Sequence, residues 1–123
     1  MKKHVTERKA RKVVAEIVTW FESTIVSHTQ NEHELRIARS ITEEFVRTLE
    51  KGPAMKQIVD AVSTSDEAAS RYVDNMKRHA FSLIRHSFRT KARELAPNND
   101  ASVAVTLLDR IVETLIFGRP LAS

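Results

Sequence analysis

Glycine and proline are scarce in this chain, and their scarcity limits the folds that it can adopt. Only two glycines and three prolines occur among 123 residues. Turns depend on these residues, so a chain with so few of them favours a handful of long helices over many short strands. Hydrophobic residues make up 41% of the sequence, which is enough for a core. We therefore expect an all-α protein of about five helices in a compact bundle.

The length and the even composition of the chain predict one domain. A chain of 123 residues has the size of an ordinary single domain. We see no internal repeat, low-complexity tract or linker that would divide it. We therefore assign residues 1–123 to a single helical domain, in which residues 1–12 form a basic N-terminal arm or helix start.

Apolar residues recur at helical spacing in five stretches, and polar residues that can cap helices separate them. The expected helices span about residues 6–28, 32–51, 54–62, 65–95 and 100–117. Thr6 and Asn31 are expected to cap the first two, and Asp100 the last. Thr64 and Glu67 read as a capping box that opens the fourth.

The fourth helix is the longest and carries an amphipathic pattern. Some 30 residues at 1.5 Å each would make a rod of about 45 Å, which is long for a domain of this size. We therefore expect one end to lie on a partner. Its inner face is expected to hold Ala69, Tyr72, Val73, Met76, Ala80, Leu83, Ile84, Phe88, Ala92 and Leu95.

The fifth helix is apolar nearly all round, so it needs burial on more than one side. A second copy of the chain would supply that burial, and the sequence therefore predicts a homodimer. The expected interface consists of Leu107, Leu108, Ile111, Val112, Leu115 and Ile116.

Several classes of protein are excluded by what the sequence lacks. The absence of cysteine removes disulfides and thiolate chemistry and fits a reducing compartment. No apolar run approaches the roughly 20 residues that cross a bilayer. The basic first residues are followed by more charge before any apolar stretch, unlike a cleaved signal peptide. We expect a cytoplasmic protein that does not insert into a membrane.

No residue pattern points to catalysis or to a cofactor. The chain has neither a glycine-rich phosphate loop nor a nucleophile elbow. His79 and His86 share a helical face, but two turns of about 5.4 Å keep them too far apart to hold one metal. We therefore expect a protein that is not an enzyme, with no metal and no cofactor.

The first twelve residues carry most of the excess positive charge. Six of the 20 Lys and Arg residues fall there, against one of the 16 acids, so the remainder is nearly neutral. A basic arm of this kind can contact phosphates or an acidic surface, and it can equally be a solvated helix start. Its basic residues are Lys2, Lys3, Arg8, Lys9, Arg11 and Lys12.

A row of arginines follows one face of the fourth helix, opposite its apolar stripe. At 100° per residue its members fall within about 80° of one another. Such a row can track phosphates in a salt-dependent way. It can also be a solvated face that pairs with acids of the second helix, namely Glu43, Glu44 and Glu50. The row consists of Arg71, Arg78, Arg85, Arg89 and Arg93.

The order of parts from about residue 31 to 118 resembles the C-terminal half of a TetR-family transcriptional regulator. An amphipathic helix ends in the segment 49–53, just at a proline, and a short helix follows from Ala54 to Val62. A long helix then runs into the segment 88–97, and an apolar helix extends from Asp100 to Gly118. The resemblance implies a four-helix dimer interface from the last two long helices and a small-molecule site among the others. The family's N-terminal helix-turn-helix has no counterpart here, since the chain opens with one long helix.

Together these patterns lead to two functional hypotheses. The first is a non-enzymatic helical regulatory module that dimerises and binds a protein partner or a small apolar effector, with an effect on transcription. The second is a nucleic-acid-binding protein that uses the basic arm and the arginine row. The two differ in salt dependence, because contacts with phosphate weaken steeply as salt rises.

Overall fold

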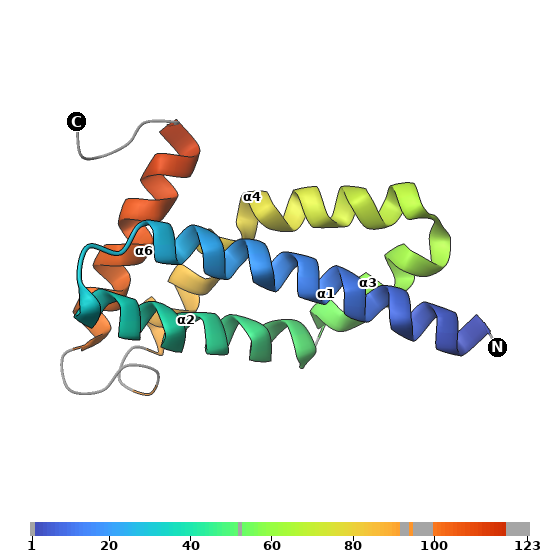
Figure 1. Ribbon diagram of the computed structural model, residues 1–123, viewed down its shortest axis with the longest axis horizontal. Helices are drawn as coiled ribbons and strands as arrows, with labels where there is room; N and C mark the ends of the chain where they lie inside the picture. Colours follow the sequence, from blue (N-terminus) through green and yellow to red (C-terminus); the bar gives the residue numbers. More distant parts are fainter. Residues whose placement is uncertain (1, 52, 92–93, 95–99, 118–123) are drawn as a thin grey trace.

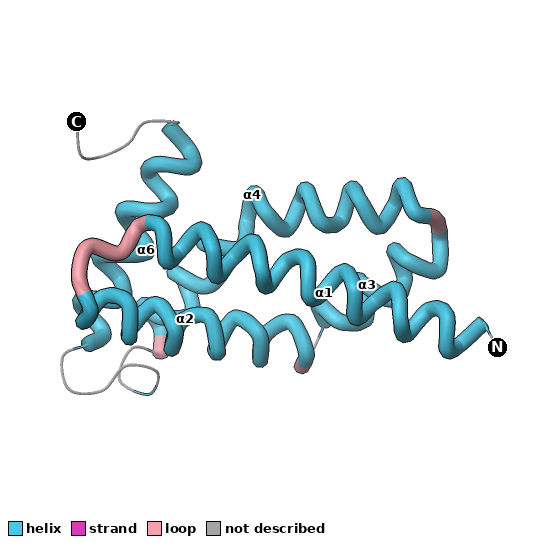
Figure 2. Tube along the Cα trace, in the orientation of Figure 1, coloured by secondary structure: helices cyan, strands magenta, loops and turns pink. Residues whose placement is uncertain are grey.

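The computed structural model describes residues 2–51, 53–91, 94 and 100–117, with side chains from residue 5 to 115 of these ranges. The described residues form five α-helices and confirm the all-α prediction. They are α1 (Lys2–Ser27), α2 (Glu32–Glu50), α3 (Pro53–Thr64), α4 (Asp66–Thr90) and α6 (Asp100–Phe117). Short loops join α1 to α2 and α3 to α4 (Figure 2).

The helices pack as an antiparallel pair covered by the rest of the chain. α1 and α2 lie side by side and run in opposite directions (Figure 1). The short α3 turns the chain at one end of this pair, and α4 returns along the other side of α1. α6 crosses the opposite end, where it packs on α4 and α2.

Stacked aromatic rings join three helices in the main core. The ring of Phe21 in α1 lies 4.1 Å from that of Phe45 in α2 and 4.3 Å from that of Phe81 in α4, nearly parallel to both. Trp20 meets Phe81 edge-on at 5.5 Å. Aromatic pairs in these arrangements add about 1 kcal/mol each beyond the area they bury. A smaller cluster of Ala10, Ile58 and Val62 ties α1 to α3.

α4 is shorter than predicted and is bent. It ends at Thr90, while Ala92 and Leu95 of the expected inner face lie outside the described residues. In Figure 1 its first half runs along α1, and its second half then turns towards α6. The prediction of a rod about 45 Å long was therefore wrong.

The bend also changes which side of α4 is buried. Leu83 was expected inside but is 53% exposed, whereas Phe81 is 1% exposed. Phe81 is buried because its ring packs on Trp20 and Phe21 of α1. Because α4 packs on α3 and α6 as well as on α1, a single helical stripe does not describe its buried side.

Helix caps agree with the sequence in one case and differ in three. The Asn31 side chain accepts a hydrogen bond from the Glu34 backbone N–H at 2.9 Å, as predicted. α4 is capped by Ser65, which accepts from the Ala68 N–H at 3.0 Å. Thr64 instead ends α3, and its hydroxyl donates to the carbonyl of Asp60. Thr6 lies inside α1, and Asp100 is already helical; boundaries read from sequence shift by this much.

Candidate functional site

The predicted dimer interface on α6 is largely buried within one chain. Its first four residues are 0–3% exposed because α6 packs between α4 and α2. These are Leu107, Leu108, Ile111 and Val112. Leu115 is 45% exposed, and the side chain of Ile116 lies outside the described residues. For these four residues, the burial that a second copy was expected to supply comes from the chain itself.

The arginine row is divided by ion pairs. Arg85 and Arg89 both contact the same carboxylate oxygen of Asp109 on α6, at 3.3 and 2.9 Å. Arg71 pairs with Glu67 one turn earlier in α4. Arg78 is exposed and has no ion pair among the described residues. Arg93 lies outside them.

The pairing partners of the row are not the ones expected. Asp109 on α6 takes the place of the α2 acids, and Glu44 pairs with Arg47 of its own helix at 3.2 Å. Two of the four described arginines therefore tie α4 to α6. Because Arg85 and Arg89 share the carboxylate of Asp109, part of the positive charge that would attract a phosphate backbone is already neutralised.

The basic start of α1 keeps more of its charge free. Arg8, Arg11 and Lys12 are exposed and have no ion pair among the described residues. Their spacing places them on one side of α1. Lys9 points elsewhere, with its ammonium 3.3 Å from Asp66 at the start of α4. The side chains of Lys2 and Lys3 are not among those that the structure describes.

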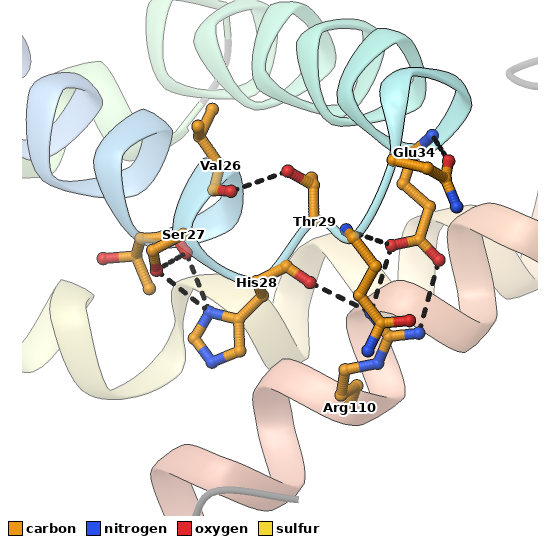
Figure 3. Close-up of polar contacts among 9 residues, drawn as sticks. Val26, Ser27, His28, Thr29, Glu34 and Arg110 are labelled. Carbon is orange, nitrogen blue, oxygen red and sulfur yellow. Dashed lines mark hydrogen bonds and ion pairs between the residues drawn. The ribbon is translucent and has the colours of Figure 1, made fainter. Parts of the chain in front are cut away.

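A charged contact clamps the α1–α2 loop to α6. The Arg110 guanidinium donates to both carboxylate oxygens of Glu34, at 3.1 and 3.3 Å, and to the backbone carbonyl of His28 at 2.9 Å (Figure 3). The same Glu34 carboxylate accepts the backbone N–H of Gln30 at 2.9 Å. One arginine thereby fixes both ends of the turn between α1 and α2. A single arginine next to an acid within an otherwise apolar helix was the signal for this contact, and sequence reasoning missed it.

The clamp changes the acidity of Glu34. The hydrogen bond from Arg110 lowers the pKa of the Glu34 carboxyl below its ordinary value, and burial opposes this effect without cancelling it. The Gln30 N–H and the positive charge of Arg110 act in the same direction as the hydrogen bond. Glu34 and Arg110 keep only 12% and 20% of their side-chain surfaces exposed. This pair holds the fold together and leaves little of itself for a ligand.

An open hollow in the described part of the surface lies between α1 and α2. It has a volume of about 630 Å³, with an apolar floor and both acids and a base at its rim. Its lining consists of Val18, Glu22, Val26, Leu35, Arg39, Thr42, Glu43 and Val46. A second hollow of about 340 Å³ continues it along the same two helices and shares Val18 and Val46 with the first. Its other residues are Arg11, Val14, Ala15, Glu50 and Met55. We call the two together the α1–α2 groove.

The residues of the groove follow the spacing of helix packing. On α1 they are at positions 11, 14, 15, 18, 22 and 26, and on α2 at 35, 39, 42, 43, 46 and 50. Steps of three and four residues form a stripe along one side of a helix, and such stripes pack against other helices. Each helix of the pair thus has a second stripe beside the one that faces the core.

The charges at the rim of the groove have no ion-pair partner among the residues that the structure describes. Glu22, Arg39 and Glu43 form no ion pair among the described residues, although Arg39 and Glu43 are one turn apart. Arg11 and Glu50 at the other end are also without one in the described part. Val18, Leu35 and Val46 are apolar at helical spacing, so this apolar pattern alone does not separate them from the residues of the core. The three-and-four spacing of the rim was the signal that could have separated the two stripes.

The described residues offer little else that resembles a ligand site. They hold no group of three or more His, Asp or Glu side chains placed to bind a metal. None of the described helices is long and apolar enough to span a membrane. The groove is therefore the main candidate surface.

Comparison with known proteins found no relative of this chain. No protein-family model, no curated protein and no solved structure matches the chain. The resemblance to the C-terminal half of TetR-family regulators stays a prediction.

Proposed function

We propose that this protein is a non-enzymatic helical interaction module whose α1–α2 groove binds an amphipathic helix of a protein partner. The observation that carries the proposal is the continuous groove itself, which has an apolar floor and rim charges without partners in the described chain. A helix laid in such a groove buries its apolar face, and its polar flanks meet the rim. The proposal includes a regulatory effect on transcription, and the support for that part is the TetR-like order of the helices.

The shape of the groove favours a helix over a small apolar effector. From Arg11 to Val26 it follows α1 for about 22 Å at 1.5 Å per residue. Small-molecule sites enclose most of their ligand and rely on a few convergent polar groups. This groove is long and open along its length, and its charges lie along the rim. A partner helix of about 15 residues would fill it.

The proposal is tested by cross-linking from within the groove. A photoreactive amino acid is placed at exposed Ala15, and a matched control carries it at exposed Asn75 of α4. We expect a protein to be captured in cells from position 15 only. The captured protein is then identified, purified and titrated against this one by calorimetry.

The proposal also requires that residues of the groove contact the partner directly. The substitution Val46→Glu places a charge on the apolar floor and should weaken the purified complex at least about tenfold, or about 1.4 kcal/mol. Asn75→Glu is the control and should leave affinity unchanged. Capture from both positions alike, or binding that ignores Val46→Glu, would overturn the proposal.

Nucleic-acid binding is a second candidate, and the basic side of α1 favours it. Arg8, Arg11 and Lys12 are exposed there and unpaired among the described residues, whereas the arginine row is partly neutralised by Asp109 and Glu67. Binding to a mixed duplex DNA should then fall by at least tenfold between about 50 and 200 mM salt. Arg8→Glu with Lys12→Glu should abolish it, and Arg78→Glu should have less effect. Binding that is absent at the lower salt would rule this candidate out.

A further inference from the structure

We infer that the helix partner of the α1–α2 groove is a second copy of this chain, so that two α1–α2 pairs face each other about a two-fold axis. This inference rests on the proposed function of the groove, because it names the partner that the groove accepts. It moves the expected homodimer from α6, where Leu107, Leu108, Ile111 and Val112 are buried, to a face whose apolar residues are still partly uncovered.

The first argument is the order of charges along the groove. At one end α1 presents Glu22 and α2 presents Arg39, which line the same hollow. At the other end α1 presents Arg11 and α2 presents Glu50. Each helix therefore changes sign along its length, and the two helices carry opposite signs at each end.

This order matches itself under two-fold rotation. If the axis runs along the helices, α1 lies on α2 of the second copy at the same level, and Arg11 meets Glu50 while Glu22 meets Arg39. If the axis runs across the helices in the plane of the interface, α1 lies on α1 of the second copy, reversed. Arg11 then meets Glu22, and Arg39 meets Glu50. Both arrangements bring opposite charges together, as a self-complementary interface requires.

The second argument is the near balance of these charges. The rim holds two arginines and three glutamates. A partner with a strong charge of one sign would find repulsion at one end of the groove, because like charges across an interface are unfavourable. A second copy offers the same balance in the matching order.

The third argument is the place of the apolar floor. Val18 and Val46 belong to both hollows and lie at the middle of the groove, with charges towards either end. Interfaces concentrate apolar contacts at their centre and polar ones at the rim. The two-fold axis would pass near these two valines, so that four antiparallel helices close over a shared apolar seam.

The first experiment measures the mass of the full chain by sedimentation equilibrium from about 1 to 100 µM, the affinity range of modest interfaces. We expect a monomer–dimer equilibrium in this range. Ala15→Glu and Val46→Glu should each weaken the dimer at least tenfold. Asn75→Glu should not. Ala15 is exposed, so its substitution leaves the core intact, and circular dichroism checks the fold of all three variants.

The second experiment uses charge reversal to identify the arrangement. Arg39→Glu alone should weaken the dimer about tenfold under either axis. Adding Glu22→Arg restores affinity only if the axis runs along the helices, since residues 39 and 22 then face each other. Adding Glu50→Arg restores it only if the axis runs across them. Rescue by one of these double variants, and not the other, supports the inference.

The outcomes separate this inference from the proposed function. A wild-type protein that stays monomeric at 100 µM overturns the second copy as partner, while capture of a different protein from position 15 would still uphold the groove. A dimer that ignores Ala15→Glu and Val46→Glu uses another face and overturns the inference. A dimer in which neither double variant restores affinity overturns it as well.

Discussion

At the scale of single residues, the best-defined feature of the protein is the contact between Arg110 and Glu34. It joins groups that are far apart in the sequence and nearly buried in the fold. A partly buried charge that loses its partner costs more than an exposed one, because it keeps the penalty of desolvation without the attraction. The surface pair of Arg71 and Glu67, which lies within one helix and is mostly exposed, provides a comparison.

We expect Glu34→Gln to lower the free energy of unfolding by about 2 kcal/mol near pH 7. Glu67→Gln, the control in an exposed pair of α4, should cost about 0.5 kcal/mol or less. Urea unfolding of both variants measures the difference. Equal costs would mean that the clamp adds no more than a surface ion pair.

The effect of Glu34→Gln should also depend on pH. Because the pKa of Glu34 is lowered in the folded protein, the unfolded chain takes up the proton first as the pH falls. The stabilisation is complete above the unfolded pKa of about 4.3 and is lost as the pH falls through the lower folded value. Wild type and Glu34→Gln should therefore converge in stability towards about pH 3. A constant difference between pH 7 and pH 3 would contradict this assignment.

Tyr72 presents the opposite case, a polar group buried without a partner. Its hydroxyl is inaccessible and has no hydrogen bond among the described residues, and burial raises its pKa. Removing an unsatisfied polar atom releases its desolvation penalty. Tyr72→Phe should leave stability unchanged or raise it by up to about 1 kcal/mol. A clear loss in thermal unfolding would show that the hydroxyl has a partner in the folded protein.

At the scale of helices, α4 shows how neighbours determine which side of a helix is buried. A regular stripe along the sequence assumes one straight helix against one surface. α4 bends towards α6 while Phe81 stays packed on α1, so its buried side is rotated from the Leu83 side to the Phe81 side.

The two residues give a direct test of this rotation. Phe81→Ala removes a ring that contacts both Phe21 and Trp20, and should cost about 3 kcal/mol or more. Leu83→Ala changes a side chain that is mostly exposed, and should stay within about 0.5 kcal/mol. Chemical denaturation compares the two. Similar costs would mean that the apolar stripe of the sequence describes the packing better than the structure does.

The same comparison explains how much of the fold and of the site the sequence could predict. Helix positions followed from periodicity and from local caps such as Asn31, because these depend on residues a few positions apart. The burial of α6 did not follow, since apolar residues all round a helix do not say whether the same chain or another covers them. The groove was missed for a related reason. Val18 and Val46 are apolar at helical spacing, and only the packing of α1 on α2 separates them from the core.

At the scale of the whole molecule, the main core draws on α1, α2, α4 and α6 together. Helices that share one core are expected to unfold together. Trp20 is the one tryptophan in the sequence and lies against Phe81 in this core. Its fluorescence therefore reports on tertiary packing.

We expect the fluorescence of Trp20 and the helical circular dichroism signal to change in one coincident transition during urea unfolding. This is the behaviour of a single cooperative domain, as the sequence predicts for residues 1–123. Two separate transitions would show instead that α3 and the start of α4, which pack around the smaller cluster, unfold independently.

The Arg110 clamp has a further consequence for the order in which the protein folds. The contacts of Arg110 with Glu34 and His28 span 76 and 82 residues, whereas the helices and the turn between α1 and α2 are local. Closing so long a loop is entropically costly until the intervening helices have condensed. The clamp should therefore form after the rate-limiting step, so that breaking it accelerates unfolding and leaves the folding rate nearly unchanged. The contacts of Arg110 would then determine the unfolding rate, and with it the lifetime of the folded state, more than the folding rate.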